Sequence, residues 1–173
     1  MAHAEAIRSM AALYAHALAI EQEAAARYGE LAQFAADQGN APAAALFAHL
    51  AAREGQHAGS IAARAKGLDL PALKPWEYAW LDSGPPERVA HELVFRLITP
   101  HDAFKIALEA EQRARGFFEQ VFAAATDPDV KLLAAALAQE EAQHAEWLER
   151  ALATAPDPHI DWERFIAGPS GAG

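Results

Sequence analysis

The chain has 173 residues and a formal net charge of −10, and 53% of its residues are hydrophobic against 22% that are charged. This length suits one domain with a sizeable core, and the acidic balance argues against nucleic acid or an anionic membrane as the main partner. Cysteine is absent, which excludes disulfides, thiolate nucleophiles and cysteine-ligated metals. More than a quarter of the residues are Ala, the strongest helix former, and β-branched residues are scarce, so we predict an all-α protein.

The first half of the chain predicts a helix hairpin. A first helix is expected over residues 4–37, where Gly39 then fits a C-terminal cap. Asn40 and Pro42 suit the start of a second helix, which continues to about Lys66. The loop between the two helices is short, so the helices should be antiparallel.

A connector over residues 67–99 differs from the rest of the chain, because it contains four prolines and room for one short helix over 87–97. Its aromatic residues Trp76, Tyr78 and Trp80 are expected to cover the bundle or to contact another subunit. The second helix should be roughly 37 Å long. A connector of this length can cross the whole bundle, so the second and third helices can run parallel.

The third helix begins with a strong local signal. Thr99 is placed as an N-cap, Pro100 occupies the first helical position, and Asp102 completes a capping box. We expect this helix to continue to about Thr126.

The fourth helix repeats the signal with Asp127 and Pro128, and it should end before Pro156. The two short-loop hairpins and the crossover predict one four-helix bundle over residues 1–156. Residues 157–173 are predicted to form a flexible C-terminal tail.

A pattern of carboxylates and histidines is repeated in the two hairpins. In each, a Glu on the first helix is followed seven positions later by an aromatic residue, and the second helix carries Glu-x-x-His. Residues three apart share a helix face, so both members of Glu-x-x-His can ligate one centre. The residues are Glu21, Tyr28, Glu54 and His57 in the first hairpin, and Glu111, Phe118, Glu141 and His144 in the second.

The alternative explanation of this repeated pattern is that the Glu residues simply form a charged helix face exposed to solvent, which is usual for scattered Glu on Ala-rich helices. Two Glu-x-x-His matches alone are weak support for a metal site. Each one, however, lies on the second helix of a hairpin, and the first helix of that hairpin carries a Glu at the corresponding height along the bundle. The preceding leucines repeat too, with Leu46 and Leu50 matching Leu133 and Leu137. Carboxylate and imidazole ligands suit iron and manganese, and four carboxylates balance two divalent cations.

The chain resembles the rubrerythrin-like branch of the ferritin-like superfamily over about residues 11–66 and 100–152. The segments that carry the resemblance are AIEQEAAARY around Glu21, AREGQHA around Glu54, ALEAEQRARGFF around Glu111 and EEAQHA around Glu141.

The resemblance implies a ferritin-like four-helix bundle with a non-haem centre of two iron ions in its core. Manganese or a mixed pair of metals would also suit the same ligands. In the family's arrangement Glu54 and Glu141 would bridge the two metals, and the terminal ligands would be Glu21 with His57 and Glu111 with His144.

Three departures from the family pattern matter. Rubrerythrins carry a further carboxylate one turn after the third-helix ligand, where this chain has Ala114, and this puts the family's ligand switching in doubt. They also carry a fused rubredoxin module with four cysteines, so here we expect a separate electron-donor protein. Phe118 replaces a second tyrosine. Tyr28 is therefore the only matched phenol, and it is expected either to donate a hydrogen bond to a ligand carboxylate or to be a plain core aromatic.

Other carboxylates and histidines were weighed as ligands. Glu109 and Glu23 lie two positions from proposed ligands, about 200° around the helix, so only one of each pair can face inward. We prefer Glu111 to Glu109 because it aligns with Glu21 through the aromatic residue. The histidines expected to be surface or core residues are His16, His49, His91 and His101.

The resulting hypothesis is a di-iron oxidoreductase that reacts with O₂ or peroxide, with ferroxidase or peroxide-reducing activity, and that forms a homodimer or higher homo-oligomer. Two alternatives stay open: an iron-sequestering ferritin-like protein and a metal-free helical binding module.

No stretch is long and apolar enough to span a bilayer, and His16 interrupts the apolar run over 10–20. We therefore expect no signal peptide and a cytoplasmic location.

Overall fold

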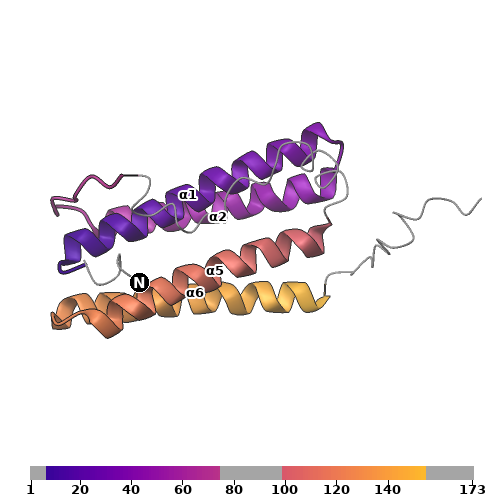
Figure 1. Cartoon of the computed structure of the whole chain (residues 1–173). Helices are drawn as coiled ribbons and strands as arrows, with labels where there is room; N and C mark the ends of the chain where they lie inside the picture. The colour runs from indigo at the N-terminus through magenta and orange to yellow at the C-terminus, as the bar shows by residue number, and fades with distance from the viewer. Residues whose placement is uncertain (1–6, 75–98, 155–173) are drawn as a thin grey trace, which may run out of the picture.

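The computed structural model describes residues 7–74 and 99–154, and within them it contains helices and no strands. The helices are α1 (Met10–Asp37), α2 (Ala41–Arg64), α5 (Pro100–Ala124) and α6 (Pro128–Thr154) (Figure 1). The prediction of an all-α bundle is confirmed. The expected short helix over 87–97, the connector aromatics, His91 and the tail over 157–173 lie outside the described residues.

The first hairpin differs from the prediction at its beginning. Helix α1 starts at Met10 and not near residue 4, because the side chain of Ser9 accepts a hydrogen bond from the Ala12 amide and caps the helix there. The turn after α1 is as predicted, with Gly39 at a φ of 75°. Asn40 then caps α2 by accepting from the Ala43 amide.

The predicted capping box at the start of α5 is confirmed. The Asp102 amide donates to the Thr99 hydroxyl at 3.1 Å, and the Thr99 amide donates to the Asp102 carboxylate at 2.9 Å. Helix α5 ends at Ala124, two residues earlier than expected, because Ala125 adopts extended backbone angles. Helix α2 likewise ends at Arg64, two residues before the expected Lys66.

Replacing Thr99 by Ala should lower the free energy of unfolding by about 1 kcal/mol, because the first turn of α5 loses the hydroxyl that accepts from the Asp102 amide. Chemical denaturation measures the change. Thr126→Ala, in the exposed loop between α5 and α6, is the matched control. Equal stability of the two variants would contradict a role for the cap.

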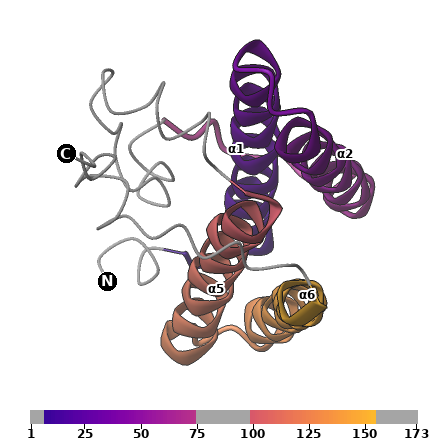
Figure 2. The ribbon, with the colours of Figure 1, turned by 90° about the vertical axis from the view of Figure 1, so that its right-hand side faces the viewer.

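The helices pack as two antiparallel hairpins, α1 with α2 and α5 with α6, that lie face to face (Figures 1 and 2). Helices α2 and α5 run in the same direction, as a crossover between the hairpins requires (Figure 1). This arrangement is that of a ferritin-like bundle. No helix among the described residues is both long enough and apolar enough to cross a membrane.

The hydrophobic core is divided into two clusters. One contains Leu13, Phe118 and Val130, and the other contains Phe47 and Leu148. On every helix the predicted carboxylate ligand falls between residues of one cluster and residues of the other. The carboxylates therefore occupy a polar layer between two apolar parts of the core, where burying a charge is costly unless it is paired.

Candidate metal centre

The structure assembles the predicted ligands into two groups of three. Glu21 of α1 lies with Glu54 and His57 of α2, and the ligand atoms of this group lie within 4.8 Å of one another. The second group obeys the same limit. Its members are Glu111 of α5 with Glu141 and His144 of α6. We call these groups the first and second half-sites; each is built by a single hairpin and could hold a metal ion.

Each half-site is centred on the Nδ1 atom of its histidine. His57 Nδ1 lies 3.4 Å from Glu54 Oε2 and 3.7 Å from Glu21 Oε2. His144 Nδ1 lies 3.4 Å from a carboxylate oxygen of both of its partners, which are Glu111 and Glu141. The near-equal distances in the two hairpins reflect the repeated spacing of the sequence.

The two half-sites meet through their histidines. The imidazole rings of His57 and His144 stack with centroids 4.1 Å apart and planes inclined by 10°. This contact joins α2 to α6. It places six candidate ligands from four helices in one continuous site.

The residues of the site fit a pair of metal ions. All four carboxylates are buried, with exposed fractions between 3% and 6%. The Nδ1 atoms of His57 and His144 are buried, and among the described residues neither has a hydrogen-bond partner. Buried carboxylates that lie close to an unsatisfied imidazole nitrogen, as they do in each half-site, are what a cation with oxygen and nitrogen ligands requires.

When no metal is bound, burial and mutual proximity shift the pKa values of the three residues of the first half-site. Burial raises the pKa of Glu21 to about 7, and the adjacent Glu54 contributes to the rise. Burial opposes ionisation of Glu54 as well, but interactions with His57 and Glu21 outweigh it and lower the Glu54 pKa. The two carboxylates raise the pKa of His57 to about 9. A protonated His57 therefore supplies the positive charge that a metal would otherwise supply.

The second half-site behaves similarly. Burial raises the pKa of Glu141 well above its ordinary value, and the nearby Glu111 and Glu21 carboxylates add to the effect. Burial would lower the pKa of His144, but Glu111 and Glu141 together raise it to about 10. Binding of a metal to either half-site must therefore release protons.

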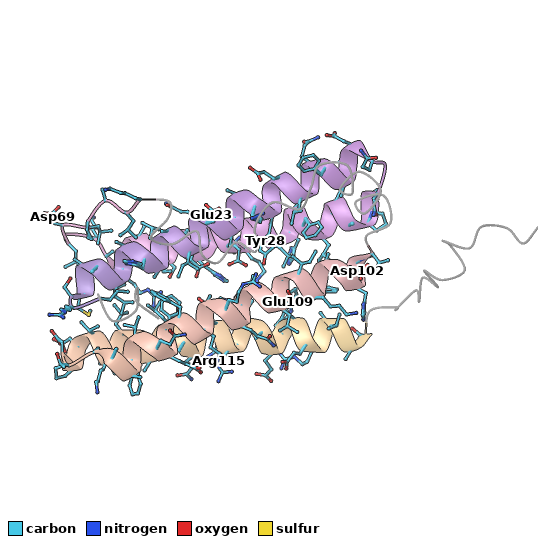
Figure 3. The ribbon with its side chains drawn as sticks, viewed as in Figure 1. Glu23, Tyr28, Asp69, Asp102, Glu109 and Arg115 are labelled. Atoms are coloured by element: carbon cyan, nitrogen blue, oxygen red, sulfur yellow. The ribbon has the colours of Figure 1, made fainter. Side chains whose placement is uncertain are left out.

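Tyr28 lies on the side of the first hairpin that faces the second (Figure 3). It is buried, and its ring packs on Phe47 with centroids 6.3 Å apart. Burial and the charge of Glu111 raise the pKa of its phenol well above 10, so the hydroxyl stays protonated. Within the described chain this hydroxyl has no hydrogen-bond partner, so a bond to a ligand carboxylate is not formed here and that role remains a prediction.

The neighbouring carboxylates Glu109 and Glu23 lie outside both half-sites. Glu109 has an exposed side chain that lies 3.8 Å from Arg113, whereas Glu111 is buried in the second half-site. Glu23 is half-buried and belongs to neither group. The predicted choice of Glu111 over Glu109 agrees with this geometry.

Three of the other histidines are described, and they lie outside both half-sites. The ring of His16 stacks on Phe117, and its Nδ1 lies 2.8 Å from a backbone carbonyl oxygen. His49 is exposed and lies beside Trp147. His101 is buried at the start of α5.

Sequence reasoning missed two contacts beside the site. Arg64 of α2 forms an ion pair with Glu140 of α6, and the guanidinium of Arg53 lies over the ring of Trp147. Neither contact has a sequence signal, because both depend on how α2 and α6 are aligned in space.

Comparison with known proteins agrees with this geometry. The sequence matches the Rubrerythrin family over residues 13–152. It is also similar to the crystal structure of an uncharacterized conserved protein from Magnetospirillum magnetotacticum MS-1, with 35% sequence identity and a TM-score of 0.70. That similarity covers 88% of this chain and 99% of the other. No curated protein matches the sequence. A match over most of the chain, together with the bundle and its repeated half-sites, shows that this chain belongs to the rubrerythrin family.

Proposed function

We propose that this chain is a non-haem di-iron oxidoreductase that reacts with O₂ or hydrogen peroxide. The observation that supports the proposal most directly is the pair of Glu₂His half-sites joined through the stacked rings of His57 and His144. Carboxylate-rich sites with one imidazole for each metal suit iron, and the four carboxylates would neutralise two Fe²⁺ ions. Iron bound as a pair would supply the two electrons that convert peroxide to water.

The chain's own residues would hold and shield the metals. Glu21, Glu54 and His57 would hold one ion, and Glu111, Glu141 and His144 would hold the other. The apolar clusters on either side exclude bulk water from the carboxylates, which strengthens their attraction for a cation. The Tyr28 hydroxyl is buried and has no hydrogen-bond partner among the described residues, and we propose that it donates a hydrogen bond to a ligand carboxylate when metal is bound.

Electrons for repeated turnover would come from outside the chain. Cysteine is absent, so no thiolate-ligated relay can form within this sequence. We therefore propose a separate electron-donor protein, and a homodimer or higher homo-oligomer as the working state.

Anaerobic reconstitution with Fe²⁺ tests the proposal. Elemental analysis should find about two iron ions per chain, one for each half-site. Stopped-flow mixing with H₂O₂ should then oxidise two Fe²⁺ for each peroxide consumed. The same experiment with O₂ compares the rates at which the two oxidants react with the iron. Iron content near zero would contradict a metal centre. Sustained peroxide reduction by a nicotinamide cofactor and the purified chain alone would contradict the need for a donor protein.

A further inference from the structure

The distance between the two half-sites depends on contacts between the hairpins. Each half-site is built by one hairpin, so a shift of one hairpin against the other would leave both half-sites intact and change only their separation. The helices pack extensively within each hairpin and much less between hairpins. The two apolar clusters also join the hairpins, but apolar packing is not directional, so polar contacts between the hairpins are the ones suited to fixing the separation that a metal pair needs.

One such contact is the ion pair between Arg64 and Glu140. The two guanidinium nitrogens of Arg64 donate to the two carboxylate oxygens of Glu140 at 2.7 and 3.0 Å. A two-point contact of this kind fixes orientation as well as distance. Arg64 lies two turns beyond His57 on α2, and Glu140 lies one turn before His144 on α6.

A second contact joins the same two helices on the other side of the histidine pair. The guanidinium carbon of Arg53 lies 4.4 Å from the ring centroid of Trp147. Arg53 lies one turn before His57, and Trp147 lies about one turn after His144. The ring of Phe104 meets Trp147 edge-on at 6.1 Å, and this contact helps to hold the indole in place.

We propose that Arg64–Glu140 and Arg53–Trp147 are two clamps that hold α2 against α6 on either side of the stacked histidines and thereby set the spacing of the two metal ions. These four residues are positioning residues, because they act through the ligands. Arg64 and Glu140 keep exposed side-chain fractions of 34% and 43%, and such partly exposed ion pairs contribute little to stability. Their main effect should be on the relation between the half-sites.

Titration with Mn²⁺ and electron paramagnetic resonance test the clamps, which presuppose the two-metal site of the proposed function. Wild type should bind two Mn²⁺ ions and give the multiline signal of a spin-coupled pair. The double variant R53Q/R64Q should still bind the first ion normally. Its second ion should bind more weakly, on the order of fivefold or more, with the signal of isolated Mn²⁺ in place of the coupled one.

A matched control separates clamping from simple loss of an ion pair. Arg115 pairs with Glu119 at 2.7 Å, but both residues lie on α5, so R115Q should keep the coupled signal. The exchanged pair R64E/E140R restores the ion pair and should recover the coupled signal relative to R64Q. Melting temperatures check that every variant is folded. If R53Q/R64Q does not fold, R64Q takes its place in the test and should show the same loss of spin coupling to a smaller extent.

The outcomes separate this inference from the proposed function. Wild type that binds fewer than two ions would contradict the proposed two-metal site, and the clamps with it. Two ions in wild type with the same coupling and affinities in R53Q/R64Q would overturn the clamps alone. Loss of coupling in R115Q, or no recovery in R64E/E140R, would also overturn them.

Discussion

The variant H57A/H144A is expected to bind less than about half of one metal ion per chain and to oxidise Fe²⁺ at least about 100-fold more slowly than wild type. Each histidine contributes the nitrogen at the centre of its half-site, within 3.7 Å of the carboxylate oxygens beside it. Residues that merely orient metal ligands already change affinity 10- to 100-fold, so loss of the ligands themselves should cost more. Elemental analysis and stopped-flow absorbance measure the two effects.

Gln56→Ala is the matched control for this variant. Gln56 lies on α2 beside His57, but it is exposed and belongs to neither half-site. It should keep full metal content and the wild-type rate. The single variants H57A and H144A show whether one half-site can hold an ion alone. Wild-type metal content in H57A/H144A would mean that the stacked histidines are not ligands.

The fold and the candidate ligands could be predicted because they depend on local rules. The helix starts at Asn40 and Thr99 follow from side chains that cap their own helices. The inward direction of Glu111 against Glu109 follows from the helical repeat, since positions two apart face nearly opposite sides. The same repeat brings Glu54 and His57 to one face of α2.

The first boundary was wrong for a physical reason. An Ala-rich segment favours helix at every position, so composition does not indicate where the helix begins. The structure begins α1 at Met10 because the hydroxyl of Ser9 satisfies a backbone amide of the first turn.

The contacts between hairpins could not be predicted from the sequence. Arg64 and Glu140 are 76 residues apart, and their meeting depends on the axial alignment of α2 and α6. The stacking of His57 on His144 depends on the same alignment. Spacing within a helix determines which face a residue occupies, but it carries no information about the height at which two helices meet.

The metal-free protein should lose stability as the pH rises from 5 to 9. A group whose pKa is raised by folding binds more protons in the folded chain than in the unfolded chain, so stability falls as the pH rises through that range. For Glu21 the range extends from the ordinary 4.5 to about 7, and for His57 from 6.5 to about 9. His144, with a pKa raised to about 10, and Glu141 act in the same direction.

Glu54 acts in the opposite direction, but outside this pH window. Its pKa is lowered from 4.5, so the stability that its ionised form contributes is lost only when the pH falls below that value. Bound metal should reverse the trend above pH 5. Metal binding needs deprotonated ligands, and a ligand that binds only the folded state stabilises it.

Thermal melts with chelator and with Fe²⁺ under anaerobic conditions measure both effects. The melting temperature of the metal-free protein should fall by roughly 5 °C or more between pH 5 and pH 9, whereas that of the loaded protein should not fall. A flat profile in chelator would mean that folding does not raise the pKa values of Glu21, Glu141, His57 and His144.

Two isosteric variants sharpen this prediction, because the two expected bridging carboxylates differ in the metal-free state. Burial disfavours the charge of Glu141, so E141Q should raise the metal-free melting temperature at pH 8. The charge of Glu54 is favoured by its contact with His57 at 3.4 Å, so E54Q should lower the melting temperature. Both variants should weaken metal binding, since each removes a carboxylate from a half-site. Effects of equal sign on the metal-free protein would show that the two half-sites are electrostatically equivalent, contrary to the asymmetry between Glu54 and Glu141.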